Sequence, residues 1–124
     1  MHEISVMAGV VEAVLRGLEA HSYNRVISVT LHVGELTFLS PDSMRFAFEA
    51  MIGNTELKGA QLIIETVPAT GVCRACGAET MVGPGEEPIH HYILPAFSCG
   101  ECGGDLDIIR GRECTVGDVR VETD

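Results

Sequence analysis

The chain has 124 residues, which suits one compact domain with a small metal-stapled module but excludes two large hydrophobic cores. Its formal net charge of −10 opposes nucleic-acid binding, because the phosphates would be repelled. No apolar run approaches the roughly 20 residues of a membrane span, and the amino terminus has no basic stretch before an apolar block. We therefore expect a cytoplasmic protein that binds neither nucleic acid nor membrane.

Hydrophobic spacing in the first half predicts two helices and two strands. Apolar residues recur every three or four positions from Ile4 to Leu18, as in an amphipathic helix, and alternate with polar residues from Val26 to Leu36, as in a half-buried strand. Ser40-Pro41-Asp42 provides an N-cap and a first-turn proline for a second helix that ends at Gly53-Asn54. The β-branched segment from Gln61 to Val67 predicts another strand.

The composition changes after this strand. Residues 69–104 are rich in Gly and Pro and show no sustained hydrophobic periodicity. We therefore expect the segment to need a cross-link, such as a bound metal ion, to fold. Leu106 to Ile109 and Val116 to Val121 resume strand-like alternation, and Gly111 and Gly117-Asp118 indicate turns. We expect the last strand to return to the first sheet. The predicted class is α+β, with a main domain of residues 1–68 and 111–124 and an inserted module of residues 69–110.

Four of the five cysteines form two Cys-x-x-Cys pairs, Cys73 with Cys76 and Cys99 with Cys102. This spacing lets both thiolates of a pair turn toward one ion, and the Gly after each pair tolerates the tight backbone. The pattern predicts a closed, structural zinc site in a zinc ribbon. Two disulfides and a rubredoxin-like iron site are the alternatives, which a reducing compartment and the long polar loop between the pairs disfavour. Cys114 stands apart, and we expect it to be a buried strand residue.

The histidines are the other candidate ligands. His2 differs from His21 and His32 because the terminal amine, nearby amide nitrogens and its imidazole could surround one ion in a plane, a geometry expected of Ni(II) or Cu(II). A frayed chain end is the alternative interpretation of His2. His90 and His91 lie in a polar loop between the cysteine pairs, either as solvated residues or as accessory nickel ligands.

Several short motifs gain meaning from their order. They are Met1-His2-Glu3, Val33-Gly34-Glu35-Leu36, Met44 to Glu49, the two cysteine pairs and Gly111-Arg112-Glu113. Together they resemble the HypA/HybF family of hydrogenase maturation nickel chaperones over nearly the whole chain. The interval between the cysteine pairs is similar to the longer loop of archaeal-type members.

The resemblance implies a fold and a set of site residues. Two helices would pack on a small three-stranded sheet, joined to a zinc ribbon in which Cys73, Cys76, Cys99 and Cys102 hold structural zinc. His2 would be the essential nickel ligand, with the Met1 amine and the Glu3 amide nearby. A HypB-type GTPase and the hydrogenase large subunit would be the partners.

We therefore predict a nickel metallochaperone that binds Ni(II) at its amino terminus and delivers it during maturation of nickel–iron hydrogenase. The sequence offers little support for an enzyme, because it contains no Gly-rich phosphate loop, nucleophile elbow or His-Glu-x-x-His helix. The alternative is a zinc-ribbon interaction module in transcription or RNA processing, which the acidic charge disfavours.

Overall fold

The computed structural model describes residues 2–81, 99 and 101–123. Its elements are α1 (Glu3–Leu18), β1 (Arg25–Gly34), the 3₁₀ helix η1 (Glu35–Thr37), α2 (Pro41–Ile52), β2 (Gln61–Val67), β3 (Thr70–Cys73), β4 (Glu79–Met81), β5 (Leu106–Arg110) and β6 (Cys114–Glu122). Within the described ranges, the helices are too short or too polar to cross a membrane.

The chain divides into two compact units. The first comprises Met1–Val33, Phe38–Glu65 and Cys114–Asp124, and the second comprises Gly34–Thr37 and Thr66–Glu113. Each unit contains one three-stranded sheet, in the order β2-β1-β6 in the first and β4-β3-β5 in the second. The last strand thus returns to the sheet of β1, as the sequence predicted.

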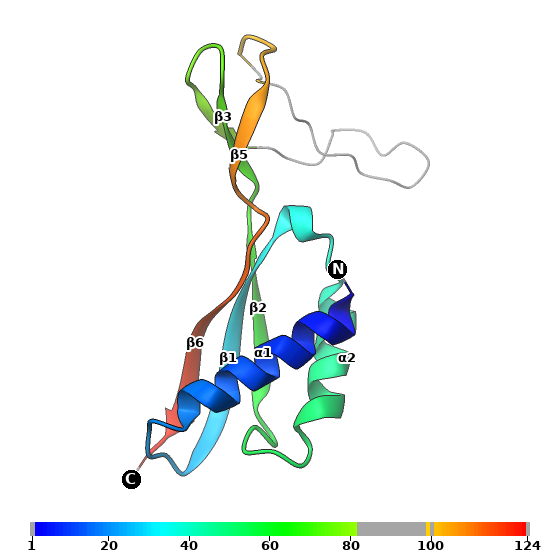
Figure 1. Cartoon of the computed structure of the whole chain (residues 1–124), viewed down its shortest axis with the longest axis vertical. Helices are drawn as coiled ribbons and strands as arrows, with labels where there is room; N and C mark the ends of the chain where they lie inside the picture. The colour runs from blue at the N-terminus through cyan, green and yellow to red at the C-terminus, as the bar shows by residue number, and fades with distance from the viewer. Residues whose placement is uncertain (1, 82–98, 100, 124) are drawn as a thin grey trace. The chain divides into compact units, whose positions relative to one another are not determined.

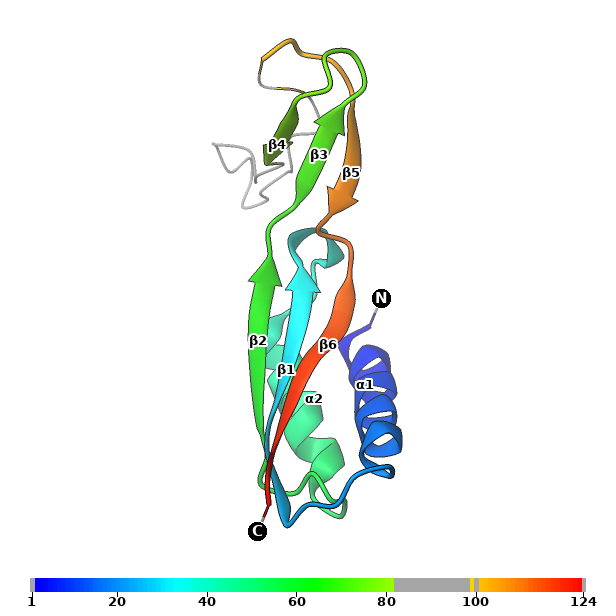
Figure 2. The same ribbon diagram turned by 90° about the vertical axis from the view of Figure 1, so that its left-hand side faces the viewer.

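Both helices pack on the same face of the first sheet (Figures 1 and 2). Figure 2 shows β1 and β2 running in the same direction, with β6 antiparallel to β1. The predicted arrangement of two helices on a three-stranded sheet is confirmed. Its core is formed by side chains from both helices and β1, of which Met7, Leu31, Met44 and Phe48 are almost completely buried.

The helix ends follow the predicted capping signals. The Ser40 hydroxyl accepts a hydrogen bond from the Ser43 N–H at 3.3 Å, and Pro41 begins α2, where its missing N–H costs no helical bond. The helix then buries Met44 and Phe48 against the core. The helix beginning at Pro41 is therefore specified by local chemistry as well as by packing.

The first and last strands differ in detail from the sequence prediction. β1 ends at Gly34, and the next three residues form η1 instead of continuing the strand to Leu36. Gly117 and Asp118, expected to form a turn, lie inside β6, where Gly117 is skipped in the pairing with β1 as a β-bulge. The bulge places the His32 imidazole where a Cβ on Gly117 would stand. Gly117 therefore lets the His32 side chain pack closely against the backbone of β6.

Three backbone segments approach one another closely in the second unit. A Cβ on Gly34 would overlap the Gly111 carbonyl group, and a Cβ on Gly111 would stand 2.6 Å from the Ala69 Cα. Gly111 also has a φ of 113°, a backbone conformation that residues with a Cβ atom rarely adopt. The N–H of Leu36 donates to the Gly111 carbonyl at 2.7 Å. Glycine is therefore required at both 34 and 111.

Candidate metal centres

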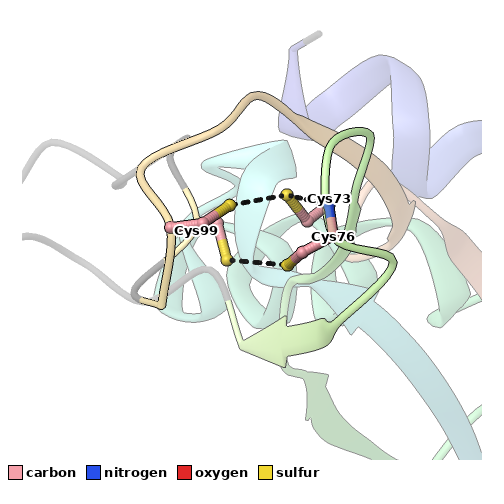
Figure 3. Close-up of side chains that lie close together, drawn as sticks. Cys73, Cys76 and Cys99 are labelled. Carbon is pink, nitrogen blue, oxygen red and sulfur yellow. Dashed lines mark hydrogen bonds between the residues drawn. The ribbon is translucent and has the colours of Figure 1, made fainter.

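The four paired cysteines come together in the second unit. Their sulfur atoms all lie within 4.8 Å of one another (Figure 3). The Sγ atoms of Cys73 and Cys102 are 3.4 Å apart, and those of Cys76 and Cys99 are 3.8 Å apart. Cys73 and Cys99 are buried, whereas Cys76 and Cys102 are exposed. The sequence thus predicted correctly which thiols converge.

Each cysteine pair belongs to a tight turn, and the two turns share one hydrogen-bond pattern. The N–H of Gly77 donates to the Cys73 carbonyl, and that of Gly103 donates to the Cys99 carbonyl, both at 2.9 Å. These two glycines have φ angles of 74° and 75°. The first residue of each pair closes its turn by donating its N–H to the carbonyl five residues later, at 2.9 Å for Cys73 and 2.8 Å for Cys99.

Backbone N–H groups in these turns point at sulfur. The amides of Ala75 and Cys76 donate to the Cys73 Sγ at 3.3 and 3.4 Å, and the amide of Glu101 donates to the Cys99 Sγ at 3.4 Å. Such bonds favour a thiolate, because they place positive hydrogen atoms beside the negative charge. The Cys76 amide, followed by the Ala75 amide, lowers the pKa of the Cys73 thiol to about 6.

The thiols of Cys76 and Cys102 have raised pKa values and resist ionisation when no cation is present. The pKa of Cys102 is raised to about 12: the Gly104 amide lowers it, but the neighbouring Cys73 and Cys76 thiols raise it by more. One thiolate therefore forms readily, whereas a second negative charge in the same cluster is repelled. A divalent cation would offset much of this repulsion, and four sulfur donors suit zinc. The cluster is able to hold a metal ion.

Two surface ion pairs connect the strands around the cysteine cluster. Arg74 donates to the Asp107 carboxylate at 2.7 Å, and Arg110 donates to the Glu79 carboxylate at 2.6 Å. These pairs join β5 to the first cysteine turn and to β4. The sequence analysis missed both β3 and β4, because strands of four and three residues are too short to show an alternating pattern.

The amino terminus is the other candidate centre, and it lies in the first unit. His2 is exposed and is the N-cap of α1, where its Nδ1 accepts from the Ile4 N–H at 3.4 Å. The first helical bond runs from the Val6 N–H to the His2 carbonyl, so the Glu3 amide precedes the helical hydrogen-bond ladder. The Glu3 carboxylate accepts from the Ser40 N–H at 3.0 Å, a contact the sequence analysis missed. Met1 lies outside the described residues.

The other candidate residues have separate places. His32 lies on β1 with its Nδ1 3.6 Å from the Glu65 carboxylate, and His21 follows the end of α1. Cys114 is half-buried at the start of β6, where burial raises the pKa of its thiol. His90 and His91 lie outside the described residues. Among the described residues, the four-cysteine group is the only cluster of three or more metal-binding side chains.

Comparison with known proteins gives one consistent result. Residues 1–121 match the family model described as hydrogenase/urease nickel incorporation, metallochaperone, HypA. The hydrogenase maturation factor HypA of Geobacter metallireducens is 37% identical over 122 residues, covering 98% of this chain and all of the relative. That of Methanothermobacter thermautotrophicus is 33% identical over 123 residues, covering 98% of each.

A solved structure agrees at the level of the fold. The solution structure of the Ni metallochaperone HypA from Helicobacter pylori superposes with a TM-score of 0.67 at 17% identity, covering both chains completely. The sequence match spans both the amino-terminal segment and the four cysteines. The chain belongs to the HypA family of hydrogenase maturation factors and nickel-incorporation metallochaperones.

Proposed function

We propose that this chain takes up Ni(II) at its amino terminus and delivers it during maturation of nickel–iron hydrogenase. The observation that carries this proposal is the arrangement of nitrogen donors at the start of α1. The His2 imidazole is exposed and turned onto its own helix end, and the Glu3 amide nitrogen has no helical acceptor. One ion could bind both donors, together with the His2 main-chain nitrogen and the Met1 amine, in exchange for the interaction between the Glu3 N–H and its own carboxylate.

The helix end suits this donor set electrostatically. A bare cation would be repelled by the partial positive charge at a helix amino terminus, but amide nitrogens that release their protons to solvent when Ni(II) binds bring negative charge there. The His2 imidazole would exchange its bond to the Ile4 N–H for the metal. Uptake therefore needs only local rearrangement of the first turn, and release needs only its reversal.

Zinc on Cys73, Cys76, Cys99 and Cys102 is the second part of the proposal. Four thiolates occupy all the positions of a tetrahedral zinc ion. The bound metal would therefore offset part of their negative charge and cross-link the module without an open position for chemistry. The converging sulfur atoms and the N–H groups directed at them support this assignment. We propose residues 1–68 and 111–124 as the nickel domain and residues 69–110 as the zinc module.

The partners follow from the family. We propose that a HypB-type GTPase assists release and that the hydrogenase large subunit receives the nickel, in the cytoplasm and without nucleic acid or membrane. The family description also names urease, which makes a urease a second candidate recipient. We assign the chain no catalytic residue. His90 and His91 are proposed as accessory nickel ligands.

The test is calorimetric titration of Ni(II) into the purified chain with a free terminal amine. His2→Ala should abolish stoichiometric nickel binding while zinc content and circular dichroism stay unchanged. His21→Ala is the matched control, because it removes an imidazole from the far end of the 16-residue α1, about 24 Å away. Equal nickel binding by His2→Ala and the parent would refute the assignment.

A further inference from the structure

The four clustered cysteines differ in their access to solvent. Cys73 and Cys99 are only 2% and 4% exposed, whereas Cys76 and Cys102 are exposed. Each turn therefore places its first cysteine inside the second unit and its second cysteine at the surface. A solute as small as hydrogen peroxide can reach the two surface cysteines without any opening of the unit.

The close sulfur contacts run between the two turns. The Sγ atoms of Cys73 and Cys102 are 3.4 Å apart, and those of Cys76 and Cys99 are 3.8 Å apart (Figure 3). Each contact thus joins an exposed cysteine to a buried one. A Cβ on Gly104 would stand 3.1 Å from the Cys73 Sγ and 3.3 Å from the Cys102 Sγ. The missing side chain at position 104 therefore leaves room for the shorter of the two contacts.

An exposed thiolate beside a second thiolate can be oxidised by a peroxide in two steps. The Cys102 sulfur attacks one oxygen of hydrogen peroxide, so that an S–O bond forms, the O–O bond breaks and hydroxide leaves. The Cys73 thiolate then attacks the sulfur of this sulfenic acid, so that an S–S bond forms and a second hydroxide leaves. The two sulfurs lose two electrons in total, and the peroxide gains them.

The second step suits the position of Cys73. Its sulfur is shielded from the solvent, so it does not meet the peroxide first, and it already lies against the Cys102 sulfur. The N–H groups of Ala75 and Cys76 donate to it and favour its thiolate form, which is the form that attacks. Cys73 is therefore placed to close the disulfide.

The disulfide would change how the second unit is held together. It removes two of the four sulfur donors, and the two thiolates that remain make a much poorer zinc site, so the ion dissociates. The new bond also joins the turn after β3 to the turn before β5, as the metal would. The second unit would thus exchange a metal cross-link for a covalent one.

We propose that Cys102 and Cys73 form a peroxide-reactive pair, in which Cys102 is oxidised first and Cys73 closes a disulfide that releases zinc. The inference rests on the proposed zinc assignment. A thiol reductant reverses the reaction and restores the four-thiolate site. Transient disulfides of this kind are the ones found in reducing compartments, where stable structural disulfides are rare.

The test uses the zinc-loaded full chain with Cys114→Ser, which leaves only the four clustered thiols. After hydrogen peroxide is added, a chromogenic chelator should report the release of one zinc ion for each pair of thiols lost. Dithiothreitol with added zinc should restore both the thiols and the bound metal. The parent chain is the matched control and should release zinc at the same rate, because Cys114 lies outside the cluster.

Mass spectrometry locates the disulfide after the free thiols have been alkylated. Proteolytic cleavage after Arg74, Glu79 and Glu101 puts each of the four cysteines on a peptide of its own. The cross-linked product should join the peptide of Cys73 to that of Cys102. This pairing distinguishes the proposed reaction from oxidation in an unfolded chain, which would favour cysteines close in sequence.

Three results would overturn the proposal: thiols that survive the peroxide, zinc that stays bound while thiols are lost, or a first disulfide between any other two cysteines. A disulfide inside one turn, Cys73 with Cys76 or Cys99 with Cys102, belongs to the last case. A purified chain that holds no zinc before the peroxide is added would instead refute the zinc assignment itself, and this inference with it. Metal analysis before and after oxidation therefore separates the two failures.

Discussion

The carboxylate of Glu3 accepts a hydrogen bond from the backbone N–H of Ser40 at 3.0 Å, and Ser40 is the residue that caps α2. The bond joins the first turn of α1 to the start of the second helix. It also holds the residue that follows His2. The amino terminus is therefore anchored by an interaction between residues 37 positions apart.

We expect Glu3→Ala to release this anchor and speed hydrogen exchange at the Ser40 amide. Glu3→Gln should have a smaller effect, because its side-chain oxygen can still accept the bond. Exchange measured by nuclear magnetic resonance on the two variants decides the matter. Equal exchange at Ser40 in the parent and in Glu3→Ala would show that the bond does not protect the Ser40 amide in solution.

The same bond predicts a pH dependence. The Ser40 N–H, together with the Glu3 amide, lowers the pKa of the Glu3 carboxyl. The stabilisation is therefore complete above the ordinary pKa of a glutamate, about 4.3, and is lost as the pH falls through the lowered value. The Ser40 amide shift should follow this titration, with a midpoint below that of an ordinary glutamate. A midpoint at or above the ordinary value would contradict the assignment.

Zinc binding should compete with protons. The pKa of Cys102 is raised to about 12 in the metal-free cluster, so zinc must displace its proton at neutral pH, whereas Cys73, with a pKa of about 6, is largely ionised already. The affinity should fall as the pH is lowered. Calorimetry in buffers of different ionisation enthalpy should detect proton release on binding. Binding without proton release would mean that the thiols are ionised before the metal arrives.

Removing one ligand should unfold only the second unit. Cys76→Ser leaves three thiolates and a poorer zinc site, and the described residues of that unit form a small sheet without a large apolar core. The helices and the first sheet bury their own core, so most of the helical circular dichroism should remain. Cys114→Ser is the control and should retain zinc. Loss of all secondary structure in Cys76→Ser would show that the two units fold only together.

Phe38 is held in an unfavourable backbone conformation. Its φ is 56°, in the left-handed region, and its side chain is 70% exposed. Phe38→Gly removes a strain of about 1–2 kcal/mol and loses little burial, offset partly by the greater entropy of an unfolded glycine. Chemical denaturation should show a net stabilisation of up to about 1 kcal/mol. Phe38→Ala keeps the Cβ and therefore the strain, and it should give no such gain.

Replacement of glycine by alanine should have opposite effects on stability at positions 34 and 9. Gly34→Ala would force a Cβ into the Gly111 carbonyl group and should destabilise the chain by about 2 kcal/mol or more. Gly9 lies within α1, and no neighbouring atom stands within 4 Å of the place that a Cβ would take, so Gly9→Ala should stabilise by up to about 1 kcal/mol. Thermal unfolding of both variants measures the contrast. A tolerated Gly34→Ala would show that the backbones separate easily.

Local patterns predicted the parts of the fold that local chemistry determines. The spacing from Ile4 to Leu18 and the Ser40-Pro41 cap indicated both helices, and the cysteine spacing indicated the four-thiol cluster. The Gly117 bulge was not predicted, because a glycine followed by an aspartate has the same composition in a bulge as in a turn. Its role depends on His32, which lies on another strand.

The candidate site at the amino terminus was predicted from the donor atoms of its own residues and from the family resemblance. The sequence indicates that His2 and Glu3 offer donors, but the Glu3–Ser40 bond depends on how α1 packs beside α2. The bond from the Ile4 N–H to the His2 imidazole depends on where the helix begins, which periodicity places only within a few residues. The contacts around His2 and Glu3 therefore depend on the packing of α1 and on its exact first residue, which sequence patterns do not specify.

The close approach of Ala69 and Gly111 has an evolutionary consequence. These residues stand where the cysteine-bearing segment begins and ends, so its two ends lie side by side. A segment with adjacent ends can be lengthened, shortened or exchanged between proteins with little demand on the chain that carries it, because closing the loop costs little more as it grows. Selection can therefore reshape the interval between the cysteine pairs while the first sheet keeps its register.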